Sequence, residues 1–459
     1  MTAGTAIFPK AFAVWFKDVE RWDVSSFQRI KWHWPKELMV PIGSVLRMRK
    51  EKADRKTFKF SDLQPITIHF DGSMDKRVVD ANREYTMDLW FARPGDIVVA
   101  KIDLKNGAVG IVPQGWENAV VTGHFAVYEP DRSKLLPEYL HLVIQANFFK
   151  AHLWRNKVGA EGRKEVKLEF FESEEIPLPP LATQKAIVAG WRKAQDEIAA
   201  ARQRVVKLES KIQTRFLADL GLKLPQLKIQ PRAFAVWWKN LFSFSARSTF
   251  LSIGIGSLNL GKYPVVRGVD CLAEVCHGCS APPSPKPTNL EILKISAATR
   301  GEFAPSEKKF AFENTLVRKQ YDLRKGDVLM CRTNGTLAYV GMSALVRENM
   351  PNLIFPDKLI RVRAKENIAP EYLWFIMQAH PLRAQIEAAA RTAVGNFAIG
   401  GNDIWNFQIP LPALPVQKQI MKRVASGRAE IAREREAAER LAQEITAEVE
   451  AMILGTKTV

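Results

Sequence analysis

Two segments of the chain carry apolar residues at alternating intervals of four and three positions. They cover residues 187–212 and 420–449. This spacing is typical of the seam of a coiled coil and narrower than the stripe of an ordinary surface helix. Each segment follows a proline-rich stretch, IPLPPL at 176–181 and IPLPAL at 409–414, and proline fixes where a helix begins because it cannot continue one backwards. The pattern predicts two long helices whose seams need a partner. The predicted seam residues are Ile187, Trp191, Ile198, Val205, Leu208 and Ile212, then Ile420, Val424, Ile431, Leu441 and Ile445.

The same unit occurs twice along the chain. Ile409 follows Ile176 by 233 positions, and pairs of residues along both helical segments keep that interval. Chance matches would not hold one interval through a whole helix. The stretches 9–17 and 231–239 also match, at an interval of 222 positions. We therefore interpret the chain as a tandem duplication that covers its whole length.

The sequence of each half predicts an α+β globule that precedes the long helix. A Gly-Asp turn that leads into an apolar stretch begins at Gly95 and again at Gly326, which is typical of a turn followed by a buried strand. We expect the next strand at 109–111 in the first half and at 340–342 in the second. A proline then marks the first turn of a helix in each half.

These elements predict an α+β fold with two globules separated by two long helices that pack as an antiparallel coiled coil. The duplicate is the obvious partner for each seam. The alternative is a helix that packs lengthwise on its own globule. The expected boundaries are 1–175 for the first globule, 176–222 for the first helical spacer, 223–408 for the second globule and 409–459 for the second helical spacer.

The charge of the chain indicates a polyanionic partner. Its formal net charge is +18 and its pI is about 9.7, which favours nucleic acid first and an anionic membrane surface second. No apolar run approaches the roughly 18 residues that span a bilayer, and no signal peptide is visible at the start. The four cysteines make no disulfide framework, so we expect a cytoplasmic protein.

The basic and polar residues of the predicted turns are the candidates for DNA contacts. Lysine and arginine supply the phosphate contacts and much of the affinity, and a minority of side chains discriminate bases. Charge and loop position select Arg47, Arg49, Lys50, Lys101, Lys105, Arg163 and Lys164 in the first half, and Lys308, Lys309, Arg332, Asn334 and Arg391 in the second.

A cysteine cluster in the second half is the candidate metal site. Cys271, Cys276, His277 and Cys279 lie close together in the sequence, and Cys331 could complete a tetrahedral zinc site. However, a single Cys-x-x-Cys is a weak signal, and the first half has no cysteines at the matching places. No metal ligand is therefore assigned.

An acidic pair in the first half is the candidate catalytic site. Asp96 followed by Asp103 and Lys105 has the residue types of a metal-dependent nuclease, yet the second half keeps Asp327 and has Asn334 in place of the second carboxylate. A turn aspartate is the better interpretation. The chain also lacks an Asn/Asp-Pro-Pro-Tyr/Phe motif of an amino-methyltransferase. The sequence predicts a binding protein without a catalytic residue.

Several short motifs recur in the two halves. They are the two proline-rich stretches with Gln184, Ile187, Gln417 and Ile420, and the turns Gly95-Asp96 and Gly326-Asp327; Val275-x-x-Gly278-x-Ser280 lies near the start of the second globule. On these residues the chain resembles the specificity subunits of Type I restriction-modification systems over essentially its full length. One departure is Ala413 where the first copy has Pro180, and the first-half counterpart of Gly278 and Ser280 is expected at Gly43 and Ser44.

The resemblance implies two target-recognition domains that together read a bipartite, asymmetric site in double-stranded DNA. It also implies that the helices dock two methyltransferase subunits, and that restriction subunits can join the complex. S-adenosylmethionine and ATP are implied for those partners, and no cofactor is expected in this chain. Two alternatives stay open: a stand-alone metal-dependent DNA endonuclease, and a basic adaptor that binds RNA or anionic lipid.

Overall fold

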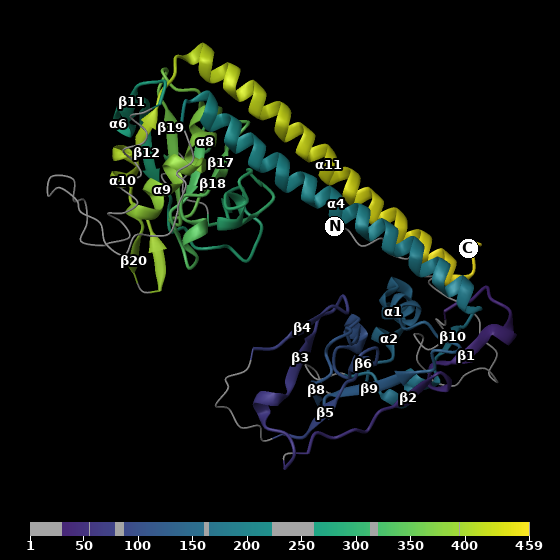
Figure 1. Ribbon diagram of the computed structural model, residues 1–459. Coiled ribbons are helices and arrows are strands. Elements are labelled where there is room, and N and C mark those ends of the chain that lie inside the picture. Colours follow the sequence, from purple (N-terminus) through teal and green to yellow (C-terminus); the bar gives the residue numbers. More distant parts are fainter. Residues whose placement is uncertain are drawn as a thin grey trace. The chain divides into compact units, whose positions relative to one another are not determined.

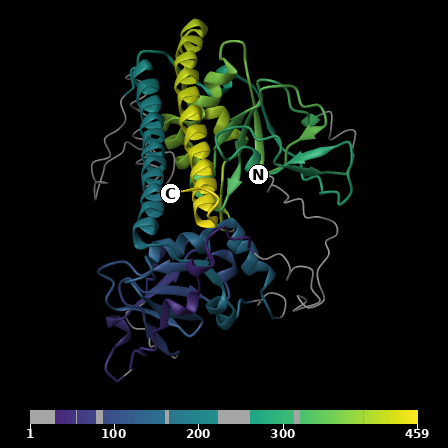
Figure 2. The same cartoon turned by 90° about the vertical axis from the view of Figure 1, so that its right-hand side faces the viewer.

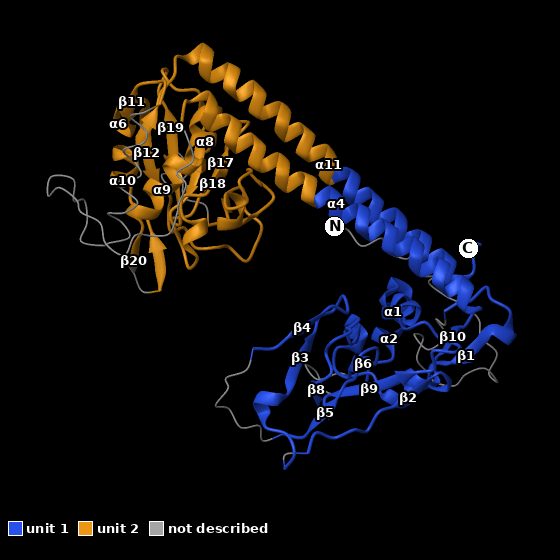
Figure 3. Cartoon of the chain, viewed as in Figure 1, with its two compact units in different colours: residues 1–202, 436–459 blue, residues 203–435 orange. Residues whose placement is uncertain are grey.

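A computed structural model of the chain describes residues 30–54, 56–78, 87–159, 165–222, 261–312, 320–393 and 395–458. These residues form two compact units (Figure 3). Unit 1 contains residues 1–202 and 436–459, and unit 2 contains residues 203–435. Each long helix is divided near its middle, so that each unit holds one end of both helices. The matching stretches 9–17 and 231–239 lie outside the described residues.

Unit 1 is an α+β globule with the first part of α4 (Leu181–Asp219) and the last part of α11 (Leu414–Leu454) (Figure 1). Its strands are β1 (Met39–Pro41), β2 (Leu46–Met48), β3 (Gln64–Ile68), β4 (Met74–Lys76), β5 (Leu89–Phe91), β6 (Ile97–Ala100), β7 (Val109–Ile111), β8 (Ala119–Thr122), β9 (Phe125–Pro130) and β10 (Glu175–Pro177). Its shorter helices are α1 (Pro137–Gln145), α2 (Asn147–Arg155) and α3 (Leu168–Ser173), with 3-10 turns that include η4 (Ile42–Ser44) and η6 (Leu104–Asn106).

Unit 2 repeats this plan with the other ends of the long helices. Its strands are β11 (Val265–Arg267), β12 (Leu272–His277), β13 (Glu291–Leu293), β14 (Lys308–Phe310), β15 (Val328–Cys331), β16 (Thr333–Asn334), β17 (Ser343–Leu345), β18 (Leu353–Ile354), β19 (Leu359–Ala364), β20 (Arg391–Ala393), β21 (Asn396–Ala398) and β22 (Gln408–Pro410). Its helices besides α4 and α11 are α6 (Gly268–Cys271), α8 (Pro370–Gln378), α9 (His380–Ala389) and α10 (Gly401–Asn406), with the 3-10 turn η10 (Leu337–Tyr339).

The main sheet has the same strand order in both units. The order is β2-β9-β6-β7 in unit 1 and β12-β19-β15-β17 in unit 2. All residues of the central strands β6 and β15 are buried. Since successive side chains of a strand point to opposite faces, Ile97 and Val99 enter the core under α1 while Val98 enters a second cluster on the other face. The apolar stretch after each Gly-Asp turn is thus a strand covered on both faces.

One strand prediction for the second half is wrong. Residues 340–342 form a turn after η10, and the strand that pairs with β15 begins at Ser343. Gly341 has a φ of 76°, a left-handed conformation that favours glycine and interrupts an extended strand. An apolar run did not reveal that the second copy has a longer loop at this point.

The glutamine that follows each proline-rich stretch fastens the long helix to its globule. Gln184 is fully buried; its Oε1 accepts a hydrogen bond from the Leu136 backbone N–H at 2.8 Å, and its Nε2 donates to two carbonyl oxygens. Gln417 makes the same three bonds, to the N–H of Ala369 at 2.8 Å and to two carbonyls. The amide therefore ties the helix start to the turn that precedes α1 or α8.

The two long helices pack against each other with opposite directions (Figures 1 and 2). In unit 2, Arg423 pairs with Asp219 at 2.9 Å and Arg435 pairs with Glu209 at 2.6 Å, so that positions rising along α11 meet positions falling along α4. A side chain at Gly427 would approach Ile212 to 2.8 Å, which shows how close the seam is there. The helices form the antiparallel pair that the seam spacing predicted.

The seam residues divide into a buried and a half-buried group. Ile187, Ile198, Val205, Ile420, Val424, Ile431 and Ile445 are buried, and Trp191, Leu208, Ile212 and Leu441 are half-buried. The ends of the helices also pack on the globules: Ile187 and Ile445 join the core of unit 1, and Val424 joins that of unit 2. Helix–helix and helix–globule packing therefore occur together. Among the described residues, no helix combines the length and the apolar character needed to cross a membrane.

Candidate nucleic-acid interface

The aspartate of each Gly-Asp turn is buried and bound to an arginine. Asp96 accepts from Arg49 Nε at 2.6 Å, and Asp327 accepts from Arg363 Nε at 2.7 Å. Each carboxylate also accepts the backbone N–H three residues earlier, which closes the turn. The hydrogen bond to Asp96 raises the pKa of Arg49. The sequence-predicted DNA contact Arg49 thus has a bidentate partner inside its own unit.

The arginine that binds the turn aspartate has a different place in each unit: Arg49 follows β2, whereas Arg363 lies in β19, and an ion pair between neighbouring strands accompanies each of them. In unit 1, Arg47 of β2 lies opposite Glu129 of β9 and forms an ion pair with it. In unit 2 the same cross-strand pair is reversed: Glu274 of β12 lies opposite Arg363 of β19, and the two pair at 2.7 Å. The duplication has kept the ion pair and exchanged its charges.

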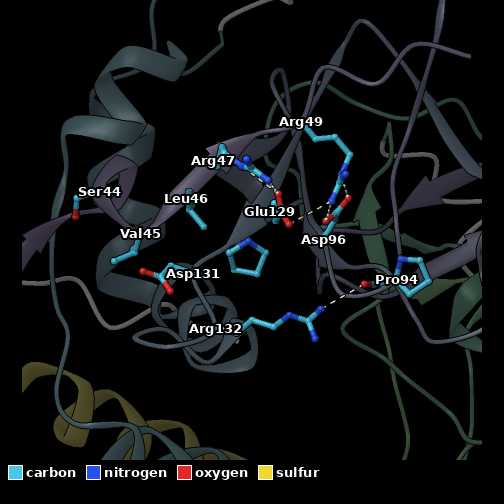
Figure 4. Close-up of a pocket in the computed structure, with 11 residues that line it drawn as sticks. Ser44, Val45, Leu46, Arg47, Arg49, Pro94, Asp96, Glu129, Asp131 and Arg132 are labelled. Carbon is cyan, nitrogen blue, oxygen red and sulfur yellow. Dashed lines mark hydrogen bonds and ion pairs between the residues drawn. The ribbon is translucent and has the colours of Figure 1, made fainter.

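A groove of about 550 Å³ in unit 1 surrounds this pair (Figure 4). Three arginines line it, yet three carboxylates lie beside them, and Arg132 donates to the carbonyl of Pro94 at 3.3 Å. Asp131 accepts from Ser133 Oγ at 2.6 Å. Because each carboxylate already has a partner and the charges balance, this groove offers no surplus positive charge to a phosphate.

At the end of the main sheet opposite the Gly-Asp turn, each unit carries a basic residue just after its central strand. The backbone N–H of Lys101, just after β6, donates to His124, and its Nζ donates to the Gly123 carbonyl at 2.8 Å. Arg332, just after β15, repeats both bonds: its N–H donates to Lys358, and its Nη1 donates to the carbonyl of Asp357 at 3.1 Å. Each unit therefore holds a cation in the same manner at the end of its central strand.

A small sheet in unit 2 extends this edge. Its order is β16-β21-β20, and it brings Asn334 and Arg391 next to the strand end that carries Arg332. The Arg391 side chain is 82% exposed and lies 3.4 Å from Asp403. In unit 1 the corresponding hairpin is marked by the bridge between Val158 and Glu165. Its predicted contacts Arg163 and Lys164 lie outside the described residues.

Comparisons with known proteins agree with this architecture. A family model for the "Type I restriction modification DNA specificity domain" matches residues 40–210. The EcoKI specificity subunit of Escherichia coli strain K12 is 26% identical over 284 residues, which cover 61% of this chain and 57% of that protein. The EcoEI specificity subunit of Escherichia coli is 22% identical over 463 residues, which cover 86% of this chain and 77% of that protein.

Residues 40–210 thus match the specificity domain of Type I restriction-modification systems, and the longer alignments show that the chain is similar to their specificity subunits. One solved structure, titled for complex assembly and conformational transition of the type I R-M system, has the same fold. Its chain is 16% identical, the TM-score is 0.56, and the alignment covers 90% of this chain and 96% of that one. The family model matches the first copy, and the duplicated strand order extends the same plan to unit 2.

The residues predicted from charge lie in three separate places. Arg47 and Arg49 line the balanced groove, and Lys308 and Lys309 lie on β14, where Lys308 pairs with Glu291 at 2.7 Å. The third place is the strand-end edge, with Lys50, Lys101 and Lys105 in unit 1 and Arg332, Asn334 and Arg391 in unit 2. Lys105 donates to the Ile102 carbonyl.

Sequence reasoning missed an exposed aromatic residue near this edge. Trp154 is 49% exposed; its Nε1 donates to Asn106 in η6 at 3.1 Å, and Lys157 Nζ lies 3.0 Å from the centre of its ring. A large exposed aromatic beside a cation suits stacking on a base or sugar. The buried residues of α2 are Phe149, His152 and Leu153, so Trp154 falls outside the buried face and helical periodicity could have indicated its exposure.

The residues weighed as catalytic and metal-binding candidates do not form such a site among the described residues. Asp96 is committed to Arg49, and Asp103 Oδ1 accepts from Asn106 at 3.0 Å. In the described part of the chain, no group of three or more His, Cys, Asp or Glu side chains is placed to hold a metal ion. The cysteines are free thiols, and burial raises the pKa of Cys271 and of Cys331 to about 11, so these thiols stay protonated at neutral pH.

Proposed function

We propose that this specificity subunit reads a bipartite, asymmetric site in double-stranded DNA, and that each unit reads one half. The observation that supports this most is the duplicated strand-end edge. The two units share a sheet, a turn aspartate and a helix-anchoring glutamine, yet their exposed edges carry different polar residues. Two domains that share a fold but differ in the polar residues of their edges suit the recognition of two different base sequences.

The net charge of +18 supports the same proposal, because phosphate contacts need a basic surface. In this proposal the paired long helices set the distance between the two half-sites and dock two methyltransferase subunits. Those subunits carry the S-adenosylmethionine, and restriction subunits that use ATP can join them. The chain itself supplies recognition without catalysis, and its free thiols suit a cytoplasmic complex.

Binding measured against salt tests the proposal. The chain assembled with its methyltransferase subunits is mixed with a labelled duplex that contains the recognised site, and a shuffled duplex or an RNA competes. Specific binding should persist as salt rises, because non-specific binding is almost wholly electrostatic. Equal competition by RNA or by the shuffled duplex would contradict the proposal.

A cleavage assay tests the non-catalytic part separately. The purified chain with magnesium and plasmid DNA should leave the plasmid intact. Cleavage that Asp96→Asn abolishes while the variant keeps its fold would show an endonuclease instead.

A further inference from the structure

The strand register shows which residues of the two units occupy equivalent positions. Tyr128 of β9 lies opposite both Met48 and Ile97, and Val362 of β19 lies opposite both Val275 and Val328. Counting from these residues to the end of each strand pairs four positions. We call them the strand-end positions: Lys50 with His277, Lys101 with Arg332, Asp103 with Asn334, and His124 with Lys358.

The register also corrects one prediction. The first-half counterpart of Gly278 is Glu51, three positions past Met48, and not Gly43, which lies in η4. Gly278 is required where it stands, because a Cβ there would overlap the carbonyl oxygen of Pro356. The edge of unit 2 therefore approaches its neighbouring loop more closely than the edge of unit 1 does.

The buried framework residues are the same in the two copies, whereas the residues at the strand-end positions differ. The buried residues that close the turns and fasten the helices are identical: Asp96 and Asp327, Tyr139 and Tyr372, Gln184 and Gln417. Tyr139 and Tyr372 even donate to equivalent carbonyls, those of Pro177 and Pro410. In contrast, all four strand-end pairs differ in residue type, and every member remains polar or charged.

The central cation of each edge is fixed by one hydrogen bond and keeps further N–H donors. Lys101 and Arg332 each give one donor to an equivalent carbonyl, of Gly123 and of Asp357. A lysine ammonium has three N–H donors and a guanidinium has five. One bond fixes the side chain, and further donors remain for a ligand. Arg332 Nε is buried and has no hydrogen-bond partner within the described residues.

We propose that the strand-end positions determine which bases each unit reads, an inference that rests on the proposed function. Arg332 suits guanine O6 and N7, and the Asn334 amide suits adenine N6 and N7. In unit 1, Lys101 suits guanine and the Asp103 carboxylate accepts from cytosine N4. The two units therefore read different sequences because these residues differ, while the shared strand register places them at equivalent positions.

His277 adds a neutral group to the edge of unit 2. Burial and the neighbouring Arg332 lower its pKa, so the imidazole is uncharged at neutral pH. Its counterpart Lys50 is an exposed ammonium. At this position unit 2 offers a hydrogen-bonding ring and unit 1 offers a charge, which extends the difference in reading chemistry.

The test compares methylated motifs made by variants of the full complex in a host that lacks other copies. Asn334→Asp removes the amide donor, and Arg332→Lys keeps the cation and its bond to Asp357 but loses the bidentate fork. Each should change the methylated motif at one or two bases of a single half-site. Binding of the original duplex should fall roughly 10- to 100-fold.

The matched control is Lys325→Gln. Lys325 is an exposed cation at the opposite end of β15, beside the Gly-Asp turn. Its loss should leave the methylated motif unchanged. Because Arg332→Lys preserves charge and local contacts, its result decides the matter even where Asn334→Asp prevents assembly.

Two results would overturn the inference. The first is that the complex with Arg332→Lys methylates the original motif as efficiently as the complex with the unaltered chain. That result would leave the proposed function intact. The second is an equal change in both halves of the motif. If the unaltered chain directs no gapped motif at all, the proposed function fails as well.

Discussion

Replacing Gln417 with methionine should destabilise unit 2 where the start of α11 is held on the globule. The side chain is fully buried and makes three hydrogen bonds, to the Ala369 N–H at 2.8 Å, the Asn367 carbonyl at 3.0 Å and the Pro412 carbonyl at 2.7 Å. Methionine fills a similar volume but can satisfy none of these groups. Each unsatisfied buried group costs about 1–3 kcal/mol, so the three together should cost roughly 3–9 kcal/mol.

Such a loss is large because whole domains are stable by only about 5–15 kcal/mol. Hydrogen exchange followed by mass spectrometry can locate it. Peptides from α8 in unit 2 should lose protection in Gln417→Met, and peptides from α1 in unit 1 should keep it. Gln184→Met should give the converse, since it breaks the same three bonds in unit 1.

The control for this pair is Gln443→Met, on an exposed position of α11. Exposed substitutions of this kind usually change stability by less than about 0.5 kcal/mol. If Gln417→Met were as stable as this control, or if both units lost protection equally, the glutamine would not be the anchor of the helix.

Three further outcomes are expected. Leu208→Pro removes a backbone donor in the middle of α4, which should cost about 3 kcal/mol or more and appear as lost helicity by circular dichroism; an unaltered spectrum would contradict the helix pairing. Gly278→Ala must displace the Pro356 carbonyl, so unit 2 should lose about 1–3 kcal/mol in chemical unfolding, and an unchanged midpoint would refute the contact. Burial lowers the pKa of His141, whose Nδ1 lies 3.1 Å from the Val109 carbonyl, so the stability of unit 1 should decrease as the pH falls below the ordinary value of 6.5. His141→Asn should flatten that pH dependence, whereas an unchanged slope would assign it to other groups.

The helices were the most predictable part of the fold. Their seams are local patterns, and α4 and α11 begin within a turn of the prolines that precede them. The turn at Asp96 was also recognisable, since a Gly-Asp pair before an apolar run describes a local conformation. Its partner was not. Arg49 follows β2 whereas Arg363 lies in β19, so the sequence alone could not show which arginine binds each turn.

The same reason limited the prediction of the site. Charge and loop position selected Lys101 and Arg332, but they also selected Arg47 and Lys308, which lie elsewhere in their units. What distinguishes the first pair is the strand register, which depends on contacts between residues far apart in the chain. A different pairing, that of β17 with β15, is shifted by three extra residues in the second copy, and no local signal in the sequence indicated them.

Sequencing the methylated positions of the host genome, with and without the gene for this chain, tests the central claim most directly. The account predicts one asymmetric, gapped motif that is methylated in the presence of the gene and unmethylated in its absence. A palindromic motif, or methylation that is identical in both hosts, would contradict a chain that reads two different half-sites.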